Sequence, residues 1–299
     1  MKYLITSLIL FCIFSNLQLM SQDLDPWAYG NLPLKLNSLS ATYAFMKGNV
    51  ISDPGAPIQD FNVTTHKIVI SYLRTFNLFG KLGRVQLPLP ASYMSGNAVF
   101  RGNDTSGSRT GLDDLKLRVG VNFLGSPPLE PQQFGKYRQE VILGISLVVT
   151  MPTGQYYPER IINLGTHRWG FKPELGLSLK IGQFFWETYG GIKFTTENSE
   201  YLVNKRLTQS PIYSIQTHFC HTFKNSIKVA LSGTYVNGGQ SSVNGNKQND
   251  YIRHLRGGIS VGMNLSQAHL LFLQMNTNLI SNISLEYNMI SLTYVYSWF

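Results

Sequence analysis

Two short stretches of the chain contain residue types that proteins use in catalysis or metal binding. The stretch GISVG, Gly258 to Gly262, matches the G-x-S-x-G pattern around the nucleophilic serine of many hydrolases. The stretch HFCH places His218 and Cys220 two residues apart, and both residue types bind zinc. The hydrolase motif needs a sharp turn from a strand into a helix, and a closed zinc site needs four ligands.

Neither stretch has the sequence context that its chemistry requires. Ser260 lies within an alternating apolar and polar run typical of a strand, so no nucleophile is expected there. His221 falls on the opposite face of its strand from His218, and no further ligands follow at a suitable spacing. The other histidines are scattered: His66, His167, His254 and His269. We therefore predict no catalytic residues, no metal and no cofactor.

The first 21 residues have the composition of a secretory signal peptide. Lys2 precedes the apolar core Leu4–Phe14, a more polar stretch follows, and we expect cleavage after Ser21. A membrane anchor is the alternative interpretation, but the apolar run is shorter than the roughly 20 residues of a spanning helix. We assign 1–21 to the signal and 22–299 to one exported domain.

The composition of the exported part narrows its class. Removing Lys2 from the 25 basic residues leaves 24 against 16 acidic ones, a net charge of +8. Cys220 is then the one remaining cysteine, so no intramolecular disulfide can form. The basic residues are dispersed and the protein is exported, so we expect no nucleic-acid partner. Their charge suits the phosphates of lipopolysaccharide.

Apolar and polar residues alternate along most of the chain, which is typical of half-buried strands. Twelve segments show this alternation: 34–46, 64–76, 81–94, 112–123, 138–151, 169–181, 184–196, 210–223, 226–237, 250–264, 267–277 and 282–299. A strand of about 11 residues, tilted by about 45°, covers roughly 25 Å, the height of the apolar band of an outer-membrane barrel. The sequence therefore predicts an all-β fold, a transmembrane antiparallel up-and-down β-barrel of about 12 strands in the bacterial outer membrane.

The connections alternate between long polar segments and short turns. The long segments are 47–63, 95–110, 152–168, 197–209 and 238–249, and the short ones are Asn77–Gly80, Gly182–Gln183, Lys224–Asn225 and Ser266. Outer-membrane barrels have long external loops and short periplasmic turns, so both termini are expected in the periplasm. One periplasmic connection, LGSPPLEPQQFGKY, is longer than a turn, and its prolines predict an ordered excursion.

Charged side chains are expected on the inward faces of the strands. The alternation places there Lys116, Arg118, Arg138, Glu140, Lys172, Glu174, Glu187, Lys193, Lys228, His254 and Arg256, and His218 also faces inward. One interpretation is a solvated, ion-paired barrel interior. The other is a mostly basic constriction that selects solutes, and the two are compatible.

The loop 152–168 is the best candidate for solute recognition. It combines aromatic, cationic and amide side chains, namely Tyr156, Tyr157, Arg160, Asn163, His167 and Arg168. Such a set suits aromatic or anionic ligands. An interfacial aromatic belt in contact with lipid phosphates is the alternative.

Two further features concern single strands. Pro88 and Pro90 remove two ladder donors from one strand, which predicts a bulge, a kink or a gap through which an apolar solute could leave sideways. Phe299 resembles the terminal aromatic signal that the barrel assembly machinery reads. We expect the last strand to continue without a bulge, with Phe299 outward and Tyr294 and Tyr296 inward; a bulge after Met289 would reverse these faces.

Four stretches resemble one known family. They are LDPWAYGNLPLKLNSLSATYAF, GLDDLKLRVGVNFLGSPPL, TMPTGQYYPERIINLGTHRWGFKPELGLS, and SPIYSIQTHFCHTF with the nearby VALSGTYVNGGQSSVNG. The family is the outer-membrane barrel family labelled "putative MetA-pathway of phenol degradation", whose members are described as transporters. The resemblance implies a twelve-stranded barrel that passes small hydrophobic or aromatic compounds, and it brings no catalytic residues.

We therefore expect an outer-membrane channel or transporter for small solutes, with lipid, lipopolysaccharide and the assembly machinery as its partners. One alternative is a lipid-cleaving hydrolase, which would need a Ser–His pair on the lipid-facing surface. Others are a structural or adhesive barrel with a plugged lumen and a soluble periplasmic β-protein. The long repeated strands argue against the last.

Overall fold

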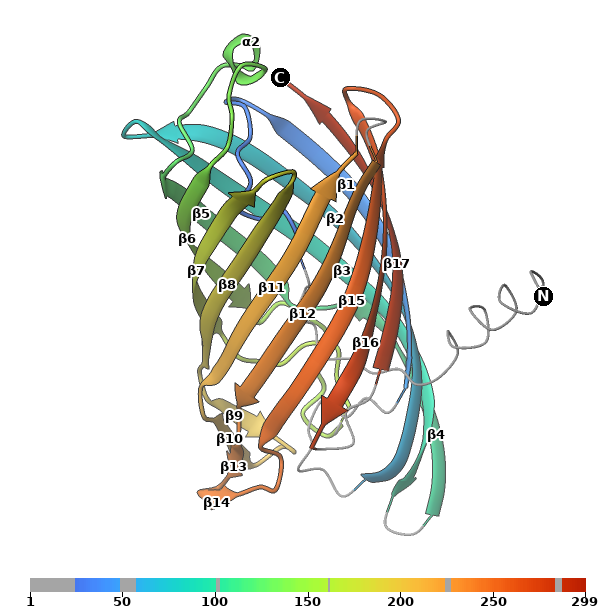
Figure 1. Ribbon diagram of the computed structural model, residues 1–299. Helices are drawn as coiled ribbons and strands as arrows, with labels where there is room; N and C mark the ends of the chain where they lie inside the picture. The colour runs from blue at the N-terminus through green and yellow to red at the C-terminus, as the bar shows by residue number, and fades with distance from the viewer. Residues whose placement is uncertain (1–24, 49–57, 101–102, 161, 224–226, 283–286) are drawn as a thin grey trace, which may run out of the picture.

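The protein forms a closed barrel of 12 antiparallel strands in the computed structural model (Figure 1). The structure describes residues 25–48, 58–100, 103–160, 162–223, 227–282 and 287–299. The expected signal peptide, 1–21, lies outside the described residues. The predicted fold class is confirmed.

The sheet closes because β1 pairs with both β2 and β17. The barrel strands are β1 (Asn37–Gly48), β2 (Ile58–Leu78), β3 (Lys81–Phe100), β4 (Asn103–Leu112) with β5 (Leu115–Leu124), β6 (Val141–Met151), β7 (Gly170–Ile181), β8 (Phe184–Thr195), β11 (Ile212–Thr222), β12 (Ile227–Gly238), β15 (Ile252–Asn264), β16 (His269–Ser281) and β17 (Tyr287–Trp298). The pieces β4 and β5 share one place in the barrel, since both pair with β3.

The alternation sorts side chains between the lipid and the lumen as predicted. On β6, Ile145 and Leu147 are exposed on the outer surface, whereas Gly144 and Ser146 are buried inside. On β12, Leu231 is 66% exposed and the next residue, Ser232, is 6% exposed. The exterior therefore presents many large apolar side chains, which are stable in contact with lipid but not with water.

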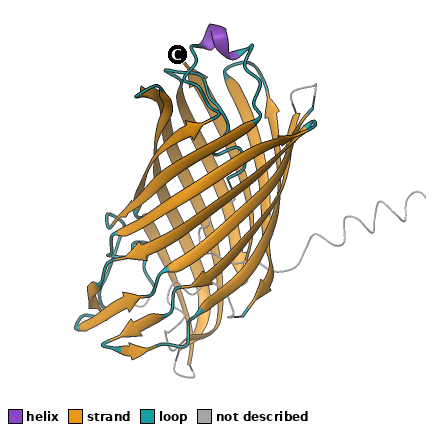
Figure 2. Ribbon diagram, turned by 60° about the vertical axis from the view of Figure 1, so that its left-hand side comes forward, coloured by secondary structure: helices purple, strands orange, loops and turns teal. Residues whose placement is uncertain are grey.

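The two ends of the barrel differ (Figures 1 and 2). The short turns lie at the end that holds Phe299 and the single helical turn α2 (Pro131–Phe134), within the proline-rich excursion. One of these turns, between β2 and β3, places Phe79 and Gly80 in the left-handed region, with φ of 50° and 77°. This end is periplasmic by the usual rule of short turns. Among the described residues, no helix is long and apolar enough to cross a bilayer.

Several segments predicted as long loops contain strands. Most of 95–110 forms the outer part of the β3–β4 hairpin, and 47–63 includes the start of β2. The segments 197–209 and 238–249 build a separate four-stranded sheet from β9 (Asn198–Tyr201), β10 (Lys205–Gln209), β13 (Ser241–Val243) and β14 (Asn246–Lys247). Polar strands are possible here because both faces of these hairpins lie outside the apolar band.

The predicted orientation of the last strand is wrong. Tyr294, Tyr296 and Trp298 are each 36–41% exposed on the outer surface, whereas Ser291 is buried inside. The pairing of β17 with β1 is continuous from Tyr287 to Trp298, so no bulge follows Met289 either. The alternation in the sequence placed Tyr287 on the outer face, but its side chain faces the lumen. The inward and outward faces of the residues that follow were therefore exchanged. Phe299 follows the strand and is 62% exposed.

Candidate functional site

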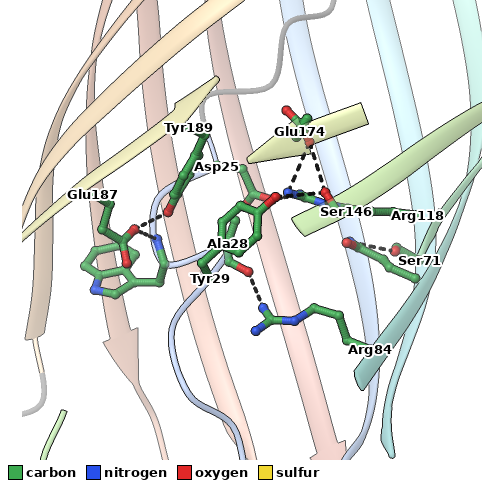
Figure 3. A network of polar contacts seen from close by, with 12 residues as sticks. Asp25, Ala28, Tyr29, Ser71, Arg84, Arg118, Ser146, Glu174, Glu187 and Tyr189 are labelled. Atoms are coloured by element: carbon green, nitrogen blue, oxygen red, sulfur yellow. Dashed lines mark hydrogen bonds and ion pairs between the residues drawn. The ribbon is translucent and has the colours of Figure 1, made fainter. Parts of the chain in front are cut away.

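The chain ahead of β1 runs inside the barrel (Figure 3). This lumen segment, Asp25–Leu36, hydrogen-bonds to side chains of β2, β3, β5 and β8. It contains two prolines and no strand, so its backbone polar groups need partners from the wall. The wall supplies them, and the segment therefore has a fixed place in the lumen.

Tyr29 lies at the centre of the lumen segment and is 2% exposed. Its hydroxyl forms a hydrogen bond with Ser146 Oγ at 2.9 Å, and its carbonyl accepts one from Asn122 Nδ2 at 3.0 Å. The guanidinium carbons of Arg84 and Arg118 lie 5.9 and 5.5 Å from the centre of its ring. Two cations over one desolvated ring are a favourable cation–π arrangement.

Two glycines leave a part of the inner wall without side chains, and the Tyr29 ring packs against it. Gly144 and Gly176 pair directly across β6 and β7 and both face inward. A Cβ at Gly176 would lie 2.3 Å from the ring carbons of Tyr29, and one at Gly144 would lie 2.6 Å from them. Glycine within a strand often marks such a close approach.

The backbone of the lumen segment is held at several other points. Arg84 donates to the carbonyls of Ala28 and Gly30, the latter at 3.1 Å. Glu187 Oε2 accepts from the Trp27 amide at 2.6 Å and from the Tyr189 hydroxyl. Both wall residues are buried, so these charge-assisted bonds form in a medium of low dielectric constant.

Three of the predicted inward charges form one network. Arg118 makes ion pairs with Glu174 at 3.2 Å and with Asp25 of the lumen segment at 3.3 Å. Lys172 pairs with the other oxygen of Glu174 at 2.8 Å. The prediction of an ion-paired interior is confirmed for these residues, and the network also anchors the lumen segment.

Towards the external end the balance of charge is positive. Lys116, Arg168 and Lys172 are close enough to Lys193 to repel its charge. Asp114 opposes them. We call these four cations the cationic region of the lumen, in which Lys172 is also paired with Glu174. The basic constriction stays a prediction.

The histidine and serine candidates are lumenal and buried. His218 Nδ1 lies 2.8 Å from Ser232 Oγ, a pair that the sequence did not indicate. No carboxylate hydrogen-bonds to His218 in the described part of the chain, where its Nε2 has no partner. Ser260 lies within β15, as predicted, and is fully buried.

Other inward candidates have different positions. Arg256 is buried and stacks on Tyr287, with its guanidinium carbon 3.9 Å from the ring centre. Arg138 and Glu140 were predicted on the lumen wall, which is wrong. Both are exposed and precede β6, because the strand begins at Val141 and not at 138.

Loop 152–168 is ordered by its own polar side chains. Asn163 accepts from the Tyr157 amide at 2.8 Å and donates to the Tyr157 and Arg160 carbonyls. His167 stacks on Tyr156 at 4.8 Å and lies 3.5 Å from Glu200 of the small external sheet. Asn163 thus stabilises the loop, whereas Arg160 is exposed and lies over the Tyr157 ring at 5.1 Å.

The barrel wall is interrupted beside the two prolines. β3 pairs with β5 up to Gln86 and with β4 from Ala91, so Leu87–Pro90 pair only with β2. The Pro90 carbonyl accepts from the Asp113 amide at 3.0 Å, so the nitrogens of Pro88 and Pro90 face the interrupted side. We call this interruption the wall break. The sequence predicted a bulge, a kink or a gap. The register shifts by one residue across the interruption, from Gln86 opposite Arg118 to Ala91 opposite Leu112, so the structure has a one-residue bulge in β4–β5 together with the loss of pairing.

Two adjacent aspartates between β4 and β5 close the wall break. Asp113 pairs with Lys67 at 2.8 Å and accepts from Ser92 at 2.9 Å. Asp114 accepts from the Gly154 amide and from the amide and hydroxyl of Thr166, at 2.6 to 2.9 Å. The wall break is thus joined to loop 152–168 by hydrogen bonds and not by a strand ladder.

Sequence reasoning missed Tyr29, Arg84 and Asn122, because it assigned no role to the chain between the signal and the first strand. A signal was present in Gly144 and Gly176, which are inward glycines at equal height on neighbouring strands. Such a pair indicates that something packs against the wall there.

Comparison with known proteins identifies the family. Residues 53–292 match the family described as "Putative MetA-pathway of phenol degradation". The chain belongs to this family. The match covers most of the chain and confirms the resemblance seen in the sequence. A search of curated proteins finds no match.

Solved structures with the same fold come from outer-membrane proteins. The COG4313 outer membrane channel from Pseudomonas putida F1 is similar with a TM-score of 0.76 and 20% identity, over 92% of this chain and 100% of that one. The β domain of the Bordetella autotransporter BrkA is similar with a TM-score of 0.53 and 13% identity, over 88% of this chain and 100% of that one. These likenesses concern the fold, which is that of an outer-membrane barrel.

Proposed function

We propose that this family member is a channel that admits small apolar or aromatic solutes from outside and releases them sideways through the wall break. The observation that carries the proposal is the loss of pairing between β3 and β4–β5. Opening the wall there breaks the side-chain contacts of Asp113 and one backbone hydrogen bond, from the Asp113 amide to the Pro90 carbonyl, but no continuous strand ladder. Such contacts cost far less to break than a run of backbone hydrogen bonds in a bilayer.

The position of the lumen segment supports the same route. Arg84, which holds the segment, precedes the wall break by three residues on β3, on the periplasmic side. A solute coming from outside therefore reaches the break before it reaches the segment. The outer surface beside the break carries Leu89, which is 45% exposed, so an apolar solute would leave into an apolar surrounding.

A structural barrel with a plugged lumen is the second candidate, because the lumen segment is fixed by so many contacts. The similar Pseudomonas protein is an outer membrane channel, which favours the first candidate. The two functions differ in whether solutes cross at all.

The test uses cells whose outer leaflet is lipopolysaccharide, since apolar solutes cross phospholipid liposomes unaided. Uptake of labelled benzyl alcohol and of a sugar is measured with and without the protein. We expect faster uptake of the alcohol and no change for the sugar. The double variant Pro88→Ala with Pro90→Ala restores two backbone N–H donors to the strand and should slow the uptake of benzyl alcohol. The matched control is Pro173→Ala on β7, which should leave the uptake unchanged.

Equal uptake of benzyl alcohol with and without folded protein would contradict a channel and favour the plugged barrel. A faster uptake that the double proline variant leaves unchanged would contradict the sideways route alone.

A further inference from the structure

The external hairpin of β3 and β4 has a hollow of about 150 Å³ on the face that continues the lumen wall. Gly96 and Gly107 pair directly across the two strands. Val63 fills the space over Gly96, where a Cβ would lie 2.5 Å from its Cγ2, whereas a Cβ at Gly107 would meet no atom within 4 Å, so the hollow is the space left over Gly107. Val63 and Met94, both buried, form an apolar floor, and Ile162 of loop 152–168 lies against it. We call this feature the glycine hollow.

The glycine hollow lies outside the apolar band of the membrane. Along β3 the outward side chains change from Leu89 and Tyr93, both exposed and apolar or aromatic, to Ser95 and Asn97. Ser108 is opposite Ser95 and is equally polar. An apolar hollow at this height faces water and not lipid, so a solute from outside can reach it.

Arg109 gives one end of the glycine hollow a positive charge. Its Nε donates to the Ile162 carbonyl at 3.3 Å and one Nη donates to the Ser108 carbonyl at 2.7 Å. No carboxylate of the described residues is within ion-pair distance of it. Burial, followed by the nearby charge of Arg160, lowers the pKa of Arg109, so a bound anion would stabilise the guanidinium.

We propose that the glycine hollow binds a small aromatic carboxylate, with the ring against Val63 and Met94 and the carboxylate on Arg109. This inference rests on the proposed function, since it assigns the hollow as the external binding site of the channel. A cavity of about 150 Å³ holds one benzene-sized ring and no long alkyl chain. A guanidinium binds a carboxylate through two parallel hydrogen bonds, which an alcohol cannot match.

The charge of the neighbouring surface agrees with an anionic ligand. The cationic region formed by Lys116, Arg168, Lys172 and Lys193 lies further along the lumen. An anion released from the hollow would therefore meet positive charge on its way inward, and it would leave sideways into lipid only as the neutral acid.

The experiment measures binding of benzoate by calorimetry to the full-length barrel in phosphatidylcholine nanodiscs, because detergent would compete for an apolar hollow. Benzyl alcohol has the ring without the charge, and acetate has the charge without the ring. We expect benzoate to bind at least about tenfold more tightly than either, a difference of about 1.4 kcal/mol.

Gly107→Phe should fill the hollow. A Cβ at this position meets no atom within 4 Å, so the barrel should still fold. We expect benzoate binding to weaken more than about tenfold, and Arg109→Gln should remove the preference for benzoate over benzyl alcohol. Ser95→Phe adds the same ring to the opposite face of the hairpin and should leave binding unchanged.

Benzoate binding that Gly107→Phe leaves intact in a folded barrel would overturn the inference, as would equal binding of benzoate and benzyl alcohol to the unmodified protein. The proposed function is tested separately by uptake. If benzoate binds and Gly107→Phe abolishes binding while cells take up no solute, the glycine hollow stands as a binding site and the channel does not.

Discussion

At the scale of single residues, the contact between Tyr29 and the wall glycines decides whether the lumen is filled. The ring has no space to shift towards the wall, since a Cβ at Gly176 would lie 2.3 Å from it. Its hydroxyl, carbonyl and π-face are all engaged. A change at Gly176 should therefore act on the lumen segment as a whole.

We expect Gly176→Val to displace Tyr29 and raise the single-channel conductance in planar bilayers. Gly190→Val is the matched control on the next strand, because a Cβ there meets no atom within 4 Å. Tyr29→Gly combined with Gly176→Val should conduct like Tyr29→Gly alone, since the two changes act on one contact. An unchanged conductance in a folded Gly176→Val barrel would show that the ring does not limit the path.

At the scale of elements, the alternation predicts each strand's existence better than its phase. On β6 large apolar residues fall on one face, so the outward face is evident from sequence. β17 offers aromatic rings on one face and small polar residues on the other, and a barrel can place tyrosines either way. The neighbouring strand β1 determines which face of β17 is inward, because Thr42 forms a hydrogen bond of 2.8 Å with Thr293 inside the lumen.

We expect replacement of both Tyr294 and Tyr296 by alanine to lower the yield of folded barrel. These rings lie on the outer surface near the periplasmic end, where aromatic side chains anchor a barrel at the interface. Folded yield is read from the shift in gel mobility on heating, and the conductance of the surviving pores should not change. The matched control is Thr293→Ala, on the lumenal face of the same strand. A larger conductance with full yield would place the rings in the lumen after all.

At the scale of the whole molecule, the sequence predicts the barrel, its strand number and its direction in the membrane. The lumen segment and the small external sheet could not be predicted, because neither has a period that a pattern can detect. Their structure depends on partners far away in the chain, such as Arg84 for Ala28 in the lumen segment and Asn244 for Arg206 in the external sheet. The wall break was partly predictable, since prolines restrict the backbone locally.

In the closed barrel, successive residues of one strand face lipid and the lumen in turn. This alternation can be tested on β1. Ala41 is outward between Leu39 and Tyr43, which are 45% and 47% exposed. Ser40, the preceding residue, faces the lumen and is half-buried there. A lysine in the lipid near the bilayer midplane costs about 2–4 kcal/mol, whereas one in a polar lumen costs much less.

We therefore expect Ala41→Lys to lower the fraction of folded barrel strongly and Ser40→Lys to lower it little. The measurement is urea-dependent folding into phosphatidylcholine vesicles, which yields the free energy of unfolding for both variants. Ala41→Leu controls for a change of size on the lipid face and should be neutral. Equal losses for the two lysines would mean that the surface holding Ala41 does not face lipid. The assignment of this exterior to the membrane would then fail for the whole barrel, because all strands share the same ladder of inward and outward positions.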